Sequence, residues 1–252
     1  MLGHLSSPSS NETFDILFGG KIRIVQEKGG YRFSIDSILL AGFIGLRKGD
    51  KVIDLGTGVG IIPLILAQKG IGAAQFVGVE IQQKLVELAE RNVSINGLEA
   101  LITIYQGDIR WLNDVFAPSS FDVVVTNPPY YRVASGRTNP YFEKAIARHE
   151  ITCTIDNVLQ TARYLLKEGG RFFVIFPAQR AITLLERLRS STLEPKRLRW
   201  VHSREGEEAK FILTESYKGG GEGLEVLAPL YVYSDTGKYT PEMKTLYSLP
   251  LQ

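Results

Sequence analysis

Short runs of β-branched and aromatic residues alternate with amphipathic segments through most of the chain. Each run is five or six residues long, as expected for a buried strand, and the amphipathic segments have the period of a helix. Strands that alternate with helices are typical of parallel βαβ units, so the pattern predicts an α/β fold with a mostly parallel sheet. The predicted strands cover residues 51–55, 75–79, 101–105, 121–126 and 171–176, and the predicted helices cover residues 60–69, 82–96, 154–167 and 178–189.

Two further β-rich runs, residues 197–202 and 210–216, are separated by only a short turn. A connection this short joins antiparallel strands, so a C-terminal hairpin is predicted at one side of the sheet. A third β-rich run covers residues 224–233. It follows Lys218-Gly219-Gly220-Gly221, which we expect to be a mobile loop.

The segment before the first predicted core strand is expected to be an appendage. Residues 1–12 are polar and rich in serine, and residues 38–41 predict a helix that packs on the core. We therefore divide the chain into residues 1–48, an N-terminal arm with an appended helix, and residues 49–252, the main domain. Residues 131–149 are a long insertion in that domain, and such a loop is usually functional or disordered.

Composition excludes several classes of protein. The 252 residues have a net charge of only +2, so the total charge indicates no partner. No apolar run reaches about 18 residues, so no membrane span is expected. Cys153 is the only cysteine, which fits a reducing cytoplasm, and the three scattered histidines give no metal-ligand spacing. A monomer and a weak dimer both remain open.

A glycine-rich segment, Asp54-Leu55-Gly56-Thr57-Gly58-Val59-Gly60, joins the first predicted strand to the first predicted helix. The glycines allow a tight turn and a close approach of a ligand to the backbone, and Glu80 at the end of the second strand can bind two ribose hydroxyls. These features fit both NAD and S-adenosylmethionine. The spacing Gly-x-Gly-x-Gly favours S-adenosylmethionine, as does the charge of Asp54, which repels a pyrophosphate and attracts an ammonium group.

Two neighbouring segments complete the expected cofactor pocket. Ile81 directly follows Glu80, and Asp108-Ile109 follows the third predicted strand. The Asp108 carboxylate can accept a hydrogen bond from the amino group of the cofactor's adenine. An aspartate at this position can equally be a turn residue or a helix cap.

The tetrapeptide Asn127-Pro128-Pro129-Tyr130 directly follows the fourth predicted strand. An aromatic amine is a poor nucleophile because its lone pair is delocalised into the ring. The Asn127 side-chain oxygen and the Pro128 carbonyl can each accept a hydrogen bond from the amine, which stabilises the positive charge that develops on it. The prolines restrict the backbone, and Tyr130 offers a face on which a flipped-out base can stack. The tetrapeptide therefore predicts chemistry on a planar nitrogen.

The glycine loop and the tetrapeptide are expected to meet in space although about 70 residues separate them. In a doubly wound sheet the strand order reverses between the first and fourth strands, so their carboxyl ends lie side by side at the binding crevice.

Basic and aromatic side chains gather in two segments. Residues 180–204 hold seven basic side chains and two acidic ones, and the insertion mixes basic with aromatic residues. Basic groups neutralise phosphates and aromatic rings stack on unpaired bases, so this mixture favours RNA, although a solvated helix face and a flexible loop can carry the same charges. The residues expected to contact RNA are Tyr131, Arg132, Arg137, Arg148, Arg197 and Arg199.

These motifs resemble the amino-methyltransferases with an Asn-Pro-Pro-Tyr motif, and among them the bacterial tRNA adenine-N6 methyltransferases that act beside the anticodon of valine tRNA. The resemblance spans nearly the whole chain and includes residues 33–40, 148–150 and 239–242. It implies a Rossmann-like methyltransferase fold, S-adenosylmethionine as cofactor and tRNA as substrate. It also implies that Asp36 and the preceding segment cover the methionine end of the cofactor, whereas the residues alone also allow Asp36 to be a helix N-cap.

Three other functions remain open at this point. A protein glutamine methyltransferase also acts on a planar nitrogen, an NAD-dependent oxidoreductase would explain the glycine loop alone, and an RNA-binding module would explain the basic segments. The basic and aromatic insertion argues against the first, and the complete cofactor loop argues against the third. We predict methyl transfer to the exocyclic amino group of an adenine in tRNA.

Overall fold

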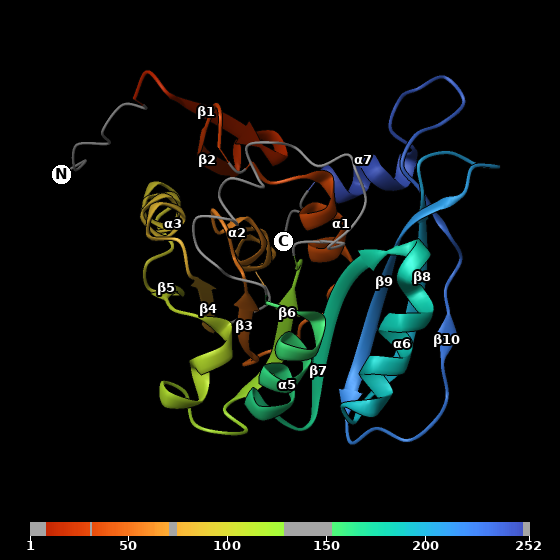
Figure 1. Ribbon diagram of the computed structural model, residues 1–252. Helices are drawn as coiled ribbons and strands as arrows, with labels where there is room; N and C mark the ends of the chain where they lie inside the picture. Colours follow the sequence, from red (N-terminus) through yellow and green to blue (C-terminus); the bar gives the residue numbers. More distant parts are fainter. Residues whose placement is uncertain (1–8, 31, 71–74, 129–152, 249–252) are drawn as a thin grey trace.

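The computed structural model describes residues 9–30, 32–70, 75–128 and 153–248 (Figure 1). Within these residues nine strands form one sheet and two others form a separate hairpin. The strands of the large sheet are β3 (Lys51–Leu55), β4 (Gln75–Glu80), β5 (Ile102–Gln106), β6 (Phe121–Thr126), β7 (Leu166–Pro177), β8 (Leu193–His202), β9 (Ala209–Lys218), β10 (Glu225–Val226) and β11 (Leu230–Tyr231).

The large sheet is parallel on one side and mixed on the other. Its order is β5-β4-β3-β6-β7-β9-β8, with β10 and β11 both paired to β8. The strands β5, β4, β3, β6 and β7 are parallel to their neighbours in this order, whereas β9 runs antiparallel to both β7 and β8. The predicted fold class, a mostly parallel sheet with an antiparallel C-terminal hairpin, is therefore confirmed.

Some predicted boundaries were wrong near the C-terminus. Strand β7 begins at Leu166, where the predicted helix was still continuing, and β8 begins at Leu193. The run 224–233 forms only the two short strands β10 and β11 rather than one strand. Pro229 lies between them, and because proline has no amide hydrogen it cannot donate to a continuous ladder.

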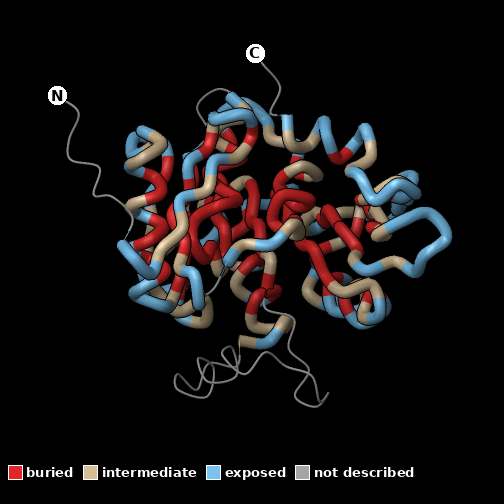
Figure 2. Tube along the Cα trace, turned by 90° about the horizontal axis from the view of Figure 1, so that it is seen from above, coloured by how far each residue is buried: buried red, intermediate tan, exposed pale blue. Residues whose placement is uncertain are grey.

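Helices cover both faces of the sheet (Figure 1). One face packs against α1 (Ile35–Phe43), α2 (Ile61–Gln68), α3 (Gln83–Ile95) and α7 (Pro241–Tyr247). The other face packs against α5 (Ile155–Leu165), α6 (Ala181–Ser190) and the 3-10 helix η2 (Ile109–Asp114). The buried residues therefore concentrate at the sheet and the inner faces of these helices (Figure 2). None of the helices in the described part of the chain has the length and apolar character needed to cross a membrane.

The N-terminal segment contains a β-hairpin that the sequence pattern did not predict. Strand β1 (Glu12–Leu17) pairs antiparallel with β2 (Ile22–Glu27). Ile22 and Ile24 are buried in the same core as α1 and α2, and the Asn92 side chain of α3 bonds both the N–H and the carbonyl of Val25. The described part of the arm thus packs on the main domain, and a division at residue 48 stays a prediction.

Candidate active site

The candidate site lies where the strand order of the sheet reverses. Strand β3 pairs in parallel with β6, and Leu55 lies opposite Thr126. The Thr126 hydroxyl also donates a hydrogen bond of 2.9 Å to the Leu55 carbonyl, so the two strand ends are joined just before their loops begin. The predicted meeting of the glycine loop with Asn127 and Pro128 is therefore confirmed. Pro129 and Tyr130 lie outside the described residues.

Asn127 follows β6, and its side chain is held by a residue of α1. The Asn127 Nδ2 donates a hydrogen bond of 3.1 Å to the Ser37 hydroxyl, and Ser37 is buried. Pro128 is buried as well. Sequence reasoning missed Ser37, because the residue lies 90 positions before Asn127 and no local signal joins the two.

The glycine loop after β3 turns tightly against the next strand. The Gly56 and Thr57 amides both donate to the Val79 carbonyl at 2.9 Å. Gly56, Gly58 and Gly60 have φ angles of 78°, 58° and 83°, a region that side chains strongly disfavour. The glycine spacing of the motif thus follows from the backbone of this turn. Helix α2 begins directly after Gly60.

Two unpartnered polar side chains lie at the base of this loop. Among the described residues, neither carboxylate oxygen of Asp54 has a hydrogen-bond partner, and the buried Thr57 hydroxyl has none either. Asp54 lies opposite Gly78 of β4, and a Cβ atom on Gly78 would come within 2.9 Å of the Thr57 side chain. Because Gly78 has no side chain, the Thr57 side chain can pack directly against the backbone of β4. A glycine inside a strand pattern often signals such a close approach, and this signal was available in the sequence.

The electrostatics of the loop favour a cation. The pKa of Asp54 is raised to about 7, chiefly by burial; the nearby Thr57 hydroxyl acts to lower it and the neighbouring Glu80 carboxylate acts to raise it. Burial also raises the pKa of Glu80, whose carboxylate accepts hydrogen bonds from the amides of Gly58, Ile81 and Gln82. Buried acceptors without partners suit a ligand that brings positive charge and donors, as S-adenosylmethionine does, and repel a pyrophosphate.

Asp108 caps a helix in this structure. Its carboxylate accepts a hydrogen bond from the Arg110 amide and forms an ion pair of 2.6 Å with the Arg110 side chain, which together lower the pKa of Asp108. The helix cap that the sequence allowed is therefore observed. Ile109 lies 4.0 Å from the Cβ position of Gly56, so η2 borders the glycine loop. Contact of Asp108 with an adenine stays a prediction.

Asp36 lies in the first turn of α1, next to Ser37. The N-cap of this helix is Ser34, so the interpretation of Asp36 as an N-cap was wrong. Burial raises the pKa of Asp36. Its neighbour Ser37 is hydrogen-bonded to Asn127, so Asp36 lies near the candidate site. Contact of Asp36 with the cofactor stays a prediction.

The basic residues between 180 and 204 are mostly engaged in ion pairs. Arg197 pairs with Glu215 at 2.9 Å, and Arg199 forms a bidentate pair with Glu242. These carboxylates come from later segments of the chain, so a local count of charges could not reveal them. Contacts of Arg197 and Arg199 with RNA stay predictions, and both would have to compete with these pairs. Tyr131, Arg132, Arg137 and Arg148 lie outside the described residues.

Arg180 lies near the candidate site and takes no part in these ion pairs. It follows the carboxyl end of β7, the strand next to β6, and its guanidinium group lies 4.9 Å from the centre of the Phe176 ring. Within the described ranges it has no carboxylate partner. Its charge therefore lies at the carboxyl ends of the strands, as Asn127 does.

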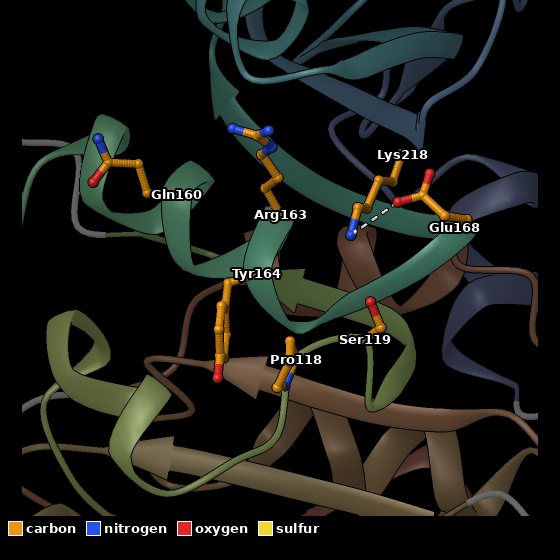
Figure 3. Close-up of a pocket in the computed structure, with 7 residues that line it drawn as sticks. All are labelled: Pro118, Ser119, Gln160, Arg163, Tyr164, Glu168 and Lys218. Atoms are coloured by element: carbon orange, nitrogen blue, oxygen red, sulfur yellow. Dashed lines mark ion pairs between the residues drawn. The ribbon is translucent and has the colours of Figure 1, made fainter.

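A separate hollow lies at the other end of the central strands, near the start of β7 (Figure 3). It has a volume of about 380 Å³, and its floor includes the start of β7 and the end of β9. Its lysine is already bonded, since Lys218 pairs with Glu168 at 3.2 Å and donates to the Leu166 carbonyl. This hollow is far from the loops after β3 and β6 and does not belong to the candidate site.

The comparisons with known proteins agree with this arrangement. A loop that favours a cationic, hydrogen-bonding ligand beside an Asn-Pro sequence suits an S-adenosylmethionine-dependent methyltransferase. Residues 46–216 match a family model described as a methyltransferase domain, a span that contains both loops. The chain therefore belongs to this methyltransferase family, whose methyl donor is S-adenosylmethionine.

Relatives with similar sequences extend over most of the chain. A protein named tRNA1(Val) (adenine(37)-N6)-methyltransferase from Actinobacillus pleuropneumoniae is 27% identical over 223 residues, which are 88% of this chain and 91% of the relative. A protein of the same name from Porphyromonas gingivalis is 29% identical and covers 90% of this chain and 91% of its own. Among solved structures, a predicted O-methyltransferase from Agrobacterium tumefaciens has a similar fold, with a TM-score of 0.68, 21% identity and coverage of 85% and 96%.

Proposed function

We propose that this protein transfers a methyl group from S-adenosylmethionine to the exocyclic amino group of an adenine in tRNA, beside the anticodon of valine tRNA. The observation that carries the proposal is the position of Asn127 and Pro128, one strand away from the cofactor loop. The names of the relatives support adenine and tRNA as the acceptor. A tRNA substrate also fits the cytoplasmic location expected from the single cysteine.

The acidic residues around the glycine loop are proposed to bind the cofactor. Bound S-adenosylmethionine supplies a methyl group on a positively charged sulfur. Asp54 contributes negative charge toward the ammonium group, and Glu80 binds the ribose hydroxyls. The remaining proposed contacts are Asp36, Gly56, Thr57, Gly58, Gly60, Ile81, Asp108, Ile109 and Asn127.

The acceptor amine is proposed to sit between Asn127 and Pro128. The Asn127 Oδ1 and the Pro128 carbonyl accept hydrogen bonds from its two N–H groups, which increases tetrahedral character at nitrogen and stabilises the developing positive charge. The new nitrogen–carbon bond forms as the carbon–sulfur bond breaks, and the methylated amine then loses one proton to solvent. Pro129 restricts the backbone and Tyr130 stacks on the flipped base.

The RNA is proposed to lie across the carboxyl ends of β6 and β7. The insertion residues Tyr131, Arg132, Arg137 and Arg148 supply stacking and charge. Arg180, which has no carboxylate partner among the described residues, adds a cation at the same end of the strands. We give it precedence over Arg197 and Arg199, which already have carboxylate partners. Basic groups of this kind neutralise backbone phosphates.

Methyl incorporation from labelled S-adenosylmethionine into RNA tests this proposal. Total RNA from a bacterial strain that lacks the enzyme is the substrate, and Asn127→Ala is expected to reduce turnover about a hundredfold to a thousandfold while cofactor affinity changes no more than a few-fold. Asn113→Ala, which alters an exposed asparagine on η2, serves as the control and should remain active. If a whole extract of that strain is used instead, label that survives ribonuclease treatment would indicate a protein acceptor.

A further inference from the structure

The last peptide unit of the glycine loop is held at both of its polar groups. The Val59 carbonyl accepts a hydrogen bond of 3.0 Å from the Asn92 Nδ2, and the Gly60 amide donates to the Thr57 carbonyl at 3.0 Å. This carbonyl and this amide belong to one planar unit, so the two bonds together fix its orientation. Val59 is 0% exposed, and solvent therefore does not compete for its carbonyl.

Asn92 lies on α3 and joins the glycine loop to the N-terminal hairpin. Its Nδ2 also donates to the Val25 carbonyl of β2 at 3.1 Å, and its Oδ1 accepts a bond of 2.7 Å from the Val25 amide. Asn92 is 0% exposed, and both of its N–H groups and its oxygen are engaged. One buried side chain thus connects α3, β2 and the end of the glycine loop.

We propose that Asn92 is a positioning residue for the cofactor, which holds the end of the glycine loop in its binding shape through the Val59 carbonyl. This inference rests on the proposed function, in which the backbone of the glycine loop contacts S-adenosylmethionine. A loop that is held in shape beforehand binds more tightly, because the ligand does not bear the cost of ordering it. When only a fraction of the molecules has the binding shape, the apparent affinity falls by that fraction.

Helix α3 is a firm support for this contact. Leu88 and Val93 are buried in the core on either side of Asn92 along the helix. The helix also lies directly against the loop, since a Cβ atom on Gly60 would come within 3.4 Å of the Ala89 Cβ. Loss of the Asn92 carboxamide should therefore leave α3 in place and free the Val59 carbonyl from it.

Asn96 supplies a matched control, one helical turn further along α3. Its side chain bonds the Arg23 amide at 2.9 Å and the Arg23 carbonyl at 2.6 Å, in the same way as Asn92 bonds Val25. Its third bond is to the Asn92 backbone carbonyl within α3. Asn96→Ala thus loosens β2 and leaves the Val59 carbonyl bonded, so the two variants separate support of the loop from anchoring of the hairpin.

Calorimetric titration with S-adenosylmethionine tests the proposal in the full-length protein. The Kd of Asn92→Ala should be about fivefold to tenfold higher than that of the wild type, as expected for the loss of one neutral hydrogen bond. Its kcat at saturating S-adenosylmethionine should stay within twofold, because Asn92 is not proposed to touch the acceptor. Asn96→Ala should have the wild-type Kd. All titrations are made at a temperature at which circular dichroism shows that the variants are folded.

Two NMR measurements do not depend on activity. In the cofactor-free protein the Gly60 amide should exchange with solvent faster in Asn92→Ala than in the wild type, and at the wild-type rate in Asn96→Ala. In the wild type alone, a scalar coupling across the hydrogen bond should connect the Asn92 Nδ2 with the Val59 carbonyl carbon. Absence of that coupling would overturn the proposal even if Asn92→Ala did not fold.

The outcomes separate this inference from the proposed function. If Asn92→Ala is folded and less stable but binds S-adenosylmethionine with the wild-type Kd, Asn92 is only structural and the function stands. An equal rise in Kd for Asn92→Ala and Asn96→Ala would assign the effect to β2, and a lower kcat at unchanged Kd would place it at the acceptor; either result would overturn the role of the Val59 bond. If the wild type binds no S-adenosylmethionine or methylates no RNA, the proposed function itself fails.

Discussion

Asp54 is a buried carboxylate beside the glycine loop, and its ionisation should oppose folding. Burial raises its pKa from 3.8 to about 7, and neither oxygen has a hydrogen-bond partner in the described part of the chain. The folded protein therefore binds a proton more tightly than the unfolded chain does. The resulting stabilisation is fully present below pH 3.8 and is lost as the pH rises through about 7.

The size of this effect follows from the shift in pKa. Relative to the protein with Asp54 protonated, a shift of about three pKa units lowers the free energy of unfolding by about 4 kcal/mol at pH 8 and by about 2 kcal/mol at pH 5. Asp54→Asn removes the charge with almost no change in volume. The variant is expected to be more stable than the wild type by about 4 kcal/mol at pH 8 and by about 2 kcal/mol at pH 5.

Urea unfolding of the two proteins at pH 5 and pH 8 measures this difference. Asp122→Asn is the control of opposite sign, because Asp122 pairs with Lys167 at 2.7 Å. Burial acts to raise the pKa of Asp122, but its hydrogen bonds with Lys167 and with the Lys51 amide lower it overall. Asp122→Asn should therefore lose stability at pH 8. If Asp54→Asn gains no more at pH 8 than at pH 5, the carboxylate is not the buried, unpartnered charge described above.

The same substitution should weaken cofactor binding. The ammonium group of S-adenosylmethionine favours ionised Asp54, so calorimetry should show wild-type affinity rising as the pH increases through about 7. In Asp54→Asn the affinity should be lower and this rise should be absent. An identical pH profile in both proteins would contradict the proposed role of Asp54.

Two further variants probe the RNA surface and the core. Arg180→Ala should lower RNA affinity and reduce the slope of log affinity against log salt by about one, whereas Arg189→Ala, in the last turn of α6 and paired with Glu194, should leave the slope unchanged. Equal slopes in the two variants would refute the Arg180 contact. Arg171→Leu leaves the buried Asp50 carboxylate without its ion-pair partner and should cost about 3–5 kcal/mol in urea unfolding; a loss below about 1 kcal/mol would refute this.

The central part of the fold was predictable from the sequence because its strands are buried on both faces. A run such as Val123-Val124-Val125 is apolar throughout and is followed by a turn signal, so its position in a parallel sheet can be inferred locally. The hairpin of β1 and β2 was missed because it is only two strands wide. Its outer strand alternates exposed Phe14 and Ile16 with polar residues, and its burial comes from contacts with α3 far along the chain.

The candidate site was predictable only where its residues lie within motifs. Asn127, Asp54 and Glu80 stand at strand ends, and the doubly wound topology brings strand ends together. Ser37 could not be inferred, because its contact depends on where α1 packs. The partners of Arg197 and Arg199 were invisible for the same reason, since tertiary ion pairs join segments that a count along the chain keeps apart.

The central claim is that Asn127 and Pro128 direct methyl transfer to the exocyclic nitrogen of one adenine in tRNA. Mass spectrometry of nucleosides and nuclease fragments from valine tRNA, isolated from the deficient strain and treated with enzyme and S-adenosylmethionine, tests it most directly. We predict N6-methyladenosine at a single position beside the anticodon, absent when the enzyme is Asn127→Ala. A methyl group on any other atom, or unmodified tRNA alongside a methylated protein glutamine, would contradict the claim.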